Sequence, residues 1–161
     1  MFKTILTLLL SSTLALAAPA CTGCQAIGGV THTFYGFPDN DPAGAATSYD
    51  CGRNYVAGGS GTYGDPLTVA TAPGELNQCE IIYDPYLKKY LRVEDFCAQC
   101  DVDWKNGIWH IDVWTGTNTW SGGDSQIACE NQLTPAAQSQ TIIRHPATNL
   151  PVDGKKLLFY E

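Results

Sequence analysis

A histidine and an aspartate two residues apart, His110 and Asp112, are the side chains of this chain best placed to do chemistry. They lie in the run Ile108–Trp114, whose alternation of side-chain types predicts a strand. Because successive side chains of a strand point to opposite faces, His110 and Asp112 share a face with two apolar residues. Apolar surroundings raise the pKa of a carboxyl group, and a carboxyl that stays protonated near neutral pH can act as a general acid. His110 fits two roles equally well, as a group that orients the substrate or a carboxylate, and as a structural histidine.

A second aspartate, Asp95, precedes this strand in the segment Val93–Cys100. Its negative charge could hold Asp112 protonated, or its oxygens could bond to the backbone where the next loop begins. The stretch around it reads as strand, acidic loop, strand, and its acids are Glu94, Asp95, Asp101 and Asp103. Alternating carboxylates can bind calcium, but the glycine and distal glutamate of a calcium loop are missing, so we interpret them as solvated loop charges. No metal and no cofactor are predicted.

Aromatic side chains near these acids suggest a surface for sugar rings. Trp104 and Trp114 could stack on pyranose faces, whereas the apolar face that carries Trp109 should belong to the core.

Short apolar runs separated by Pro and Gly predict an all-β fold, a barrel or a sandwich, with about seven strands and one short helix. The expected helix covers residues 125–133. The expected strands are 30–36, 65–72, 79–83, 87–95, 108–114, 141–144 and 156–160.

The first twenty residues have the charge and apolar pattern of a secretory signal peptide, which leaves one domain over residues 21–161. We therefore expect a secreted monomer. A net charge of −7 argues against nucleic acid and anionic membranes as partners, and leaves neutral polysaccharides and cationic polymers open.

Seven cysteines in an exported chain predict a disulfide framework with one cysteine left over. Two C-x-x-C pairs, at positions 21–24 and 97–100, would also allow a zinc site. The spacing leaves the connectivity open.

Three motifs, in order, resemble segments of the double-psi β-barrel superfamily, which includes barwin-like proteins, expansins, family-45 endoglucanases and RlpA-type proteins. Thr33–Gly36 (T-F-Y-G) is similar to the opening strand of expansins, Val93–Cys100 (V-E-D-F-C-A-Q-C) to their V-T-D-x-C-P-x-C segment, and His110–Val113 (H-I-D-V) to their H-x-D-L strand. The resemblance implies a six-stranded double-psi β-barrel that acts on a cell-wall polysaccharide.

The resemblance also implies roles for particular residues. Asp112 takes the position of the family-45 catalytic acid, Asp95 that of a second expansin aspartate, and Thr33 and Tyr35 those of the polar and aromatic groups beside it. Family-45 enzymes carry a second catalytic aspartate just after the first strand, where this chain has Gly36 and Phe37; the nearest acids are Asp39 and Asp41. Hydrolysis, lytic cleavage by one carboxylate, and non-catalytic wall binding, loosening, elicitation or inhibition all remain open.

Overall fold

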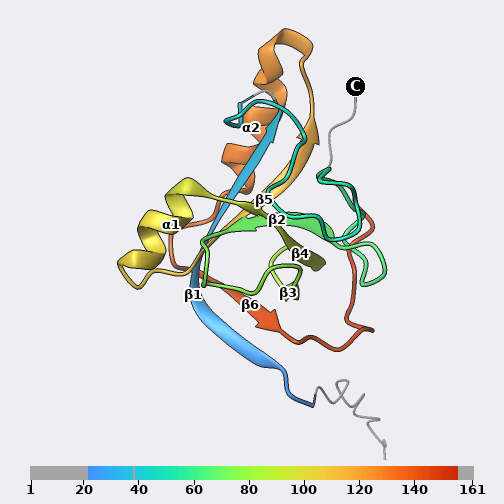
Figure 1. Cartoon of the computed structure of the whole chain (residues 1–161), viewed down its shortest axis with the longest axis vertical. Coiled ribbons are helices and arrows are strands. Elements are labelled where there is room, and N and C mark those ends of the chain that lie inside the picture. Colours follow the sequence, from blue (N-terminus) through green and yellow to red (C-terminus); the bar gives the residue numbers. More distant parts are fainter. Residues whose placement is uncertain (1–21, 38, 156–161) are drawn as a thin grey trace, which may run out of the picture.

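The computed structural model describes residues 22–37 and 39–155, which form a closed β-barrel with six strands among the described residues. Around the barrel the strands follow the order β1-β5-β2-β4-β3-β6, and Figure 1 shows α1 beside the barrel and α2 beyond one end of it. The expectation of an all-β barrel is confirmed. The strands are β1 (Gln25–Phe37), β2 (Leu67–Thr71), β3 (Ile81–Asp84), β4 (Lys89–Phe96), β5 (His110–Thr117) and β6 (Gln140–Arg144).

The strand β1 is shared between two neighbours. Its first half pairs antiparallel with β6, and its second half pairs parallel with β5 in a register that sets Thr31 beside His110 and Thr33 beside Asp112. A second parallel pair joins β2 to β4. The strands β3 and β4 form an antiparallel hairpin in which Asp84 pairs with Lys89. The residues predicted to do chemistry therefore stand on two adjacent strands.

The core inside the barrel is formed by apolar side chains that the strands point inward. In β5, Ile111 and Val113 are fully buried, and in β1 the buried face includes Val30 and Phe34. The predicted alternation of β5 is thus confirmed, and it turns Asp112 outward from this core. Leu67, Val69, Leu76, Ile82, Leu91, Val93 and Ile142 complete the buried cluster.

The prediction of an acidic loop after β4 was wrong, because residues Ala98–Lys105 form the helix α1. Cys97 is its N-cap, and its Sγ accepts a hydrogen bond of 3.0 Å from the backbone N–H of Cys100. Asp101 in the first turn and Lys105 in the last turn complement the helix dipole. Cys100 is the only buried residue of α1. The sequence therefore lacks the apolar stripe that would predict a helix here.

The helix expected at residues 125–133 is confirmed as α2 (Asp124–Leu133), preceded by the short 3-10 helix η1 (Trp120–Gly123). The seventh predicted strand, residues 156–160, and the predicted signal peptide lie outside the described residues. None of the helices in the described part of the chain has both the length and the apolar character needed to cross a bilayer.

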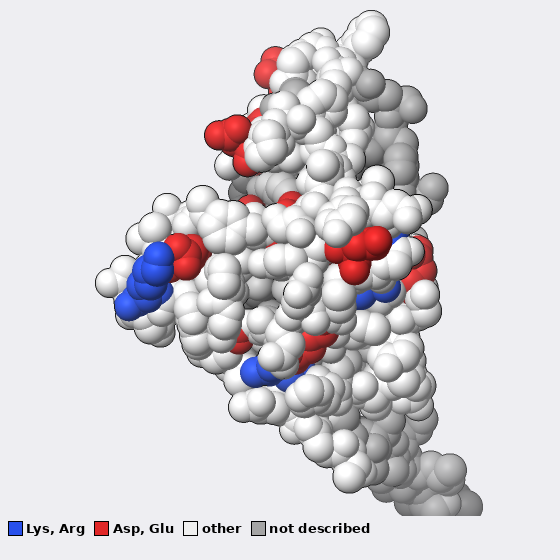
Figure 2. All heavy atoms as spheres, viewed as in Figure 1, with Lys and Arg blue, Asp and Glu red and all other residues white. Residues whose placement is uncertain are grey.

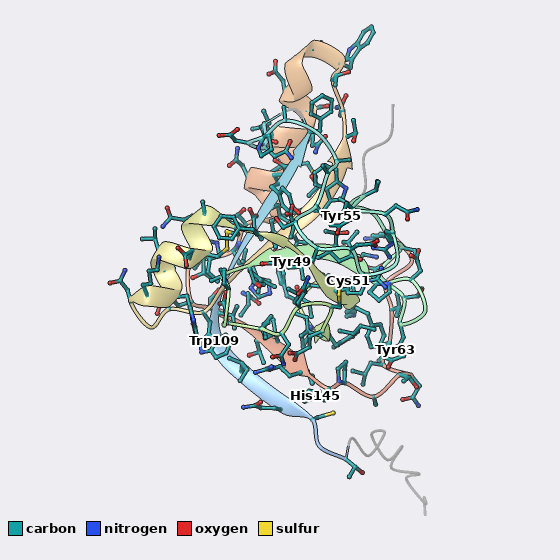
Figure 3. All side chains as sticks on the ribbon, in the orientation of Figure 1. Tyr49, Cys51, Tyr55, Tyr63, Trp109 and His145 are labelled. Atoms are coloured by element: carbon teal, nitrogen blue, oxygen red, sulfur yellow. A yellow bond between two sulfur atoms is a disulfide. The ribbon has the colours of Figure 1, made fainter. Side chains whose placement is uncertain are left out.

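Two disulfides join described cysteines. Cys51 is bonded to Cys79, which fastens the glycine-rich segment before β2 to the segment before β3, and Figure 3 shows Cys51 at the front of the barrel. Cys97 is bonded to Cys100, so this C-x-x-C pair does not supply zinc ligands. Among the described residues, Cys129 on α2 is the cysteine with a free thiol.

A buried arginine network holds the same glycine-rich segment against β4. Arg53 Nη1 lies 2.7 Å from Oε2 of the buried Glu94, and Arg92 Nη2 lies 2.6 Å from its Oε1. Glu94 is therefore a structural ion-pair partner, and the prediction that it is a solvated loop charge was wrong.

Candidate functional site

A pocket of about 400 Å³ opens where the loop after β1 meets the end of β4 and the start of α1. In the view of Figure 2, the upper part of the molecule around α2 carries acidic and no basic side chains. The lining residues are Tyr35, Asp39, Asn40, Asp41, Pro42, Ala46, Thr47, Ser48, Ala70, Asp95, Phe96, Cys97, Ala98, Gln99 and Asp112. Five of the residues predicted from the sequence thus meet in one pocket: Tyr35, Asp39, Asp41, Asp95 and Asp112.

Asp112 lies in the wall of this pocket with an altered acidity. Burial raises the pKa of its carboxyl most. Together with the charges of Glu130, Asp39 and Asp95, and against a lowering hydrogen bond from Thr33, it brings that pKa from 3.8 to about 7. The Oγ1 of Thr33 donates that bond to Oδ1 at 2.7 Å. A carboxyl with a pKa near 7 is half protonated at neutral pH, which is the state a general acid requires.

Thr33 also connects Asp112 to His110. Its Oγ1 lies 2.9 Å from Nε2 of His110, whose Nδ1 lies 2.7 Å from Oδ2 of Asp103 on α1. The backbone N–H of His110 donates to Oε1 of the buried Glu75 at 2.6 Å. His110 is itself buried and does not line the pocket, and Thr33 bonds to both His110 and Asp112.

Asp95 is held by four hydrogen bonds. The Tyr35 hydroxyl donates to Oδ2 at 2.9 Å, while Oδ1 accepts from the N–H and Oγ of Ser48 and from the N–H of Phe96, each at 2.9 Å. Burial, followed by the charges of Asp95 and Asp112, raises the pKa of Tyr35 well above its ordinary value, so Tyr35 remains a donor. Both predicted roles of Asp95 are therefore present: its Oδ1 accepts from backbone N–H groups, and its charge contributes to the raised pKa of Asp112.

Asp39 and Asp41 both line the pocket, on the loop that follows β1. Asp39 Oδ1 accepts a hydrogen bond of 3.3 Å from the N–H of Gly36, and its side chain is hydrogen-bonded to Glu130 on α2. Burial raises the pKa of Glu130, and Asp39 adds to that rise. Glu130 also accepts hydrogen bonds from Thr115 and Gln126. The loop thus places the carboxyl group of Asp39 near Asp112, although Asp39 lies four residues after Tyr35 in the sequence.

The two tryptophans predicted to bind sugar lie elsewhere than in the pocket lining. Trp114 is buried and meets Tyr35 edge-on, with ring centroids 5.2 Å apart. Trp104 is half-buried against Trp109, at 4.7 Å between centroids, and Figure 3 labels Trp109 on the side of the barrel below α1. The exposed aromatic ring in the lining is Phe96, at 44% exposure.

Three acids of this site were missed from the sequence: Glu75, Asp103 and Glu130. Asp103 was interpreted as a solvated loop charge, which was wrong because it pairs with His110. The sequence would have indicated this pairing if it had shown a helix with Asp103 on the side that faces β5. Because α1 has no apolar stripe, its sequence does not show which residues face the barrel. Glu75 and Glu130 sit in a loop and a helix with no motif around them.

The chain belongs to the family of the DDB_G0273701 N-terminal domain. The family model described as the DDB_G0273701 N-terminal domain matches residues 27–161. A relative from Dictyostelium discoideum, the uncharacterized protein DDB_G0273701/DDB_G0273221, is 37% identical over 148 residues, which cover 90% of this chain and 64% of the relative. The chain thus spans less than two thirds of the length of that relative. No solved structure matches the chain.

Proposed function

We propose that this protein is a secreted member of the double-psi β-barrel superfamily that cleaves a cell-wall glycan, with Asp112 as the general acid. The topology supports the superfamily, because a closed six-stranded barrel with two parallel pairs, β1/β5 and β2/β4, fits its architecture. The two disulfides, Cys51–Cys79 and Cys97–Cys100, fit an exported chain.

The observation that carries the proposal is the carboxyl of Asp112, which faces a pocket with a pKa of about 7. A glycosidic oxygen leaves readily only when it receives a proton as the C–O bond breaks, and a protonated carboxyl in contact with that oxygen supplies it. Asp95 suits this role less well, because its two oxygens already accept four hydrogen bonds from the protein.

Asp39 is the best candidate for the second catalytic carboxylate, the one that acts as a base. It lines the same pocket, is exposed, and is close enough to Asp112 to raise the pKa of that residue. In a hydrolytic reaction Asp39 would remove a proton from the attacking water, as the second carboxylate does in inverting glycosidases. In a lytic reaction Asp112 alone would act first as acid and then as base.

The pocket lining favours neutral or cationic sugars. Four of its residues are aspartates, and among the described residues that line it there is neither lysine nor arginine, so a uronic acid polymer would be repelled. The ring of Phe96 offers an apolar face for a pyranose, and Asn40, Ser48 and Gln99 offer hydrogen bonds to hydroxyl groups.

A non-catalytic wall-binding module is the second candidate. The hydrogen bonding of Asp95 favours it, because a carboxylate held by Tyr35, Ser48 and Phe96 shapes a binding surface and performs no proton transfer. Such a module would bind its polymer and release nothing from it.

The test is release of soluble fragments from cellulose, chitin, chitosan and bacterial walls, read by mass spectrometry. Wild type should release fragments from one polymer, and Asp112→Asn should lose at least about 100-fold of that activity. The control Asp101→Asn, whose side chain pairs with Lys105 on α1, should keep it. Activity should fall as the pH rises through 7, since the acid form of Asp112 is lost there. Binding by both wild type and Asp112→Asn without any fragments would contradict cleavage and favour the binding module.

A further inference from the structure

We infer that Asp103, His110 and Thr33 form a proton relay that reloads Asp112 after each bond cleavage, with Asp103 as a positioning residue. The inference rests on the proposed function in its hydrolytic form, in which Asp112 gives its proton away and does not recover it by acting as a base. Three consecutive hydrogen bonds carry it: Asp103 to His110 at 2.7 Å, His110 to Thr33 at 2.9 Å, and Thr33 to Asp112 at 2.7 Å.

The number of protons in this chain follows from the hydroxyl of Thr33. A threonine hydroxyl has one proton to donate and can also accept. When Oγ1 donates to Oδ1 of Asp112, Nε2 of His110 must carry a proton to bond to the same Oγ1. The Nδ1 of His110 faces the carboxylate of Asp103 and must carry a proton as well. In the proposed relay, each ring nitrogen of His110 therefore carries a proton, and the proton on Nε2 is the one held in reserve.

The relay restores Asp112 in one concerted shift. Protonated Asp112 gives its proton to the glycosidic oxygen, the C–O bond breaks, and a carboxylate remains. The Thr33 hydroxyl proton then passes to Oδ1 of Asp112, and the Nε2 proton of His110 passes to Oγ1 of Thr33. His110 ends as a neutral ring with its remaining proton on Nδ1, still donated to Asp103, and takes up a proton from solvent later.

The charges around the relay favour a reloaded acid at Asp112. Asp103 on α1 faces the ring of His110, and Glu75, between β2 and β3, accepts from its backbone N–H. At the other end, Asp112 is surrounded by Asp95 on β4, Asp39 in the loop after β1, Glu130 on α2 and the hydroxyl-bearing Tyr35 on β1. These acids oppose a negative charge on Asp112, so a proton offered through Thr33 moves toward it.

The first experiment is steady-state kinetics of fragment release at pH 5 to 8, on the polymer that the wild type cleaves. Thr33→Val keeps the shape of the side chain but removes the relay hydroxyl, and should lower kcat about 10- to 100-fold with KM unchanged. Thr33→Ser should stay within about threefold of wild type, because its hydroxyl can take the same place. Asp103→Asn should lower kcat and move the alkaline limb of the pH profile to lower pH, whereas Asp101→Asn, which pairs with Lys105 away from His110, should do neither.

The second experiment is nitrogen-15 NMR of the His110 ring near pH 6, without substrate. Wild type should show both ring nitrogens protonated, and Asp103→Asn should show one. A neutral ring in wild type, or a Thr33→Val protein that keeps the kcat of Thr33→Ser, would overturn the relay alone. A wild type that cleaves no polymer would overturn the proposed function and the relay together.

Discussion

At the scale of single residues, Gly36 explains how this chain departs from the family-45 arrangement. A Cβ on Gly36 would lie 1.6 Å from Nε2 of Gln126 and 2.8 Å from Oγ1 of Thr115. The absence of a side chain lets Gln126 on α2 reach Thr115, Gly116 and Glu130. Gly36 also donates its N–H to Asp39, so the glycine joins α2 and the candidate base to the end of β1.

The prediction at this scale is that Gly36→Ala destabilises the protein by about 1–3 kcal/mol, because the added methyl group overpacks against Gln126. Gly28→Ala, in the same strand, is the matched control: its Cβ would meet only Oγ1 of Thr141, at 3.9 Å, and stability should not fall. Chemical denaturation of both variants measures the difference. Equal stabilities would mean that Gln126 moves aside freely, and that the contact between α2 and β1 does not depend on Gly36.

At the scale of elements, the two disulfides between described cysteines constrain very different lengths of chain. Cys51 and Cys79 are 28 residues apart, so their bond removes much entropy from the unfolded state, by about 3.5 kcal/mol in the loop-closure model. Cys97 and Cys100 are three residues apart, and their bond restricts little beyond the first turn of α1. The first bond secures the barrel, and the second secures the helix that carries Asp103.

We therefore expect the double variant Cys51→Ala/Cys79→Ala to lose about 3.5 kcal/mol of unfolding free energy. The double variant Cys97→Ala/Cys100→Ala should lose less than about 2 kcal/mol. The second pair should instead affect the environment of His110, since α1 positions Asp103 against that ring. Urea unfolding gives the free energies, and the NMR signals of the His110 ring report the local effect. Equal losses from both pairs would show that the longer chain closure is not what stabilises the barrel.

The strands could be predicted from the sequence, whereas the partner of His110 could not. From His110 to Val113 in β5, polar and apolar residues alternate, so the outward position of Asp112 follows from the period of a strand. The helix α1 lacks any such period, and its placement depends on the Cys97 cap and the disulfide. Asp103 approaches His110 through that tertiary placement, and no spacing within the chain specifies it.

At the scale of the whole molecule, two sets of carboxyl groups make the free energy of unfolding depend on pH in opposite directions. Burial raises the pKa of Asp112 from 3.8 and that of Glu75 from 4.5, both to about 7. Hydrogen bonds and charges from Arg53 and Ser60 outweigh burial and lower the pKa of Asp65, and Arg144 and Asn77 do the same for Glu80. The first two groups bind protons more tightly in the folded state, and the other two bind them less tightly.

The sign of each contribution fixes the pH of greatest stability. A carboxyl with a raised folded pKa stabilises the protein fully below its unfolded pKa and loses that contribution as the pH rises toward 7, as Asp112 and Glu75 do. A carboxylate with a lowered folded pKa, such as Asp65 or Glu80, loses its contribution as the pH falls below about 4. The melting temperature should therefore peak near pH 4, where both kinds of contribution are largely present, and fall by about 10 °C or more toward pH 8.

Calorimetry of wild type beside Asp112→Asn and Glu75→Gln from pH 3 to pH 8 measures this curve. Each variant should flatten the alkaline side, because an amide cannot ionise, and should leave the acidic side in place, because Asp65 and Glu80 remain. A melting temperature that rises from pH 5 to pH 8 in wild type would mean that Asp112 and Glu75 ionise at no cost to the fold. Asp112 would then be an ordinary carboxylate at neutral pH, and the role of general acid would be lost with it.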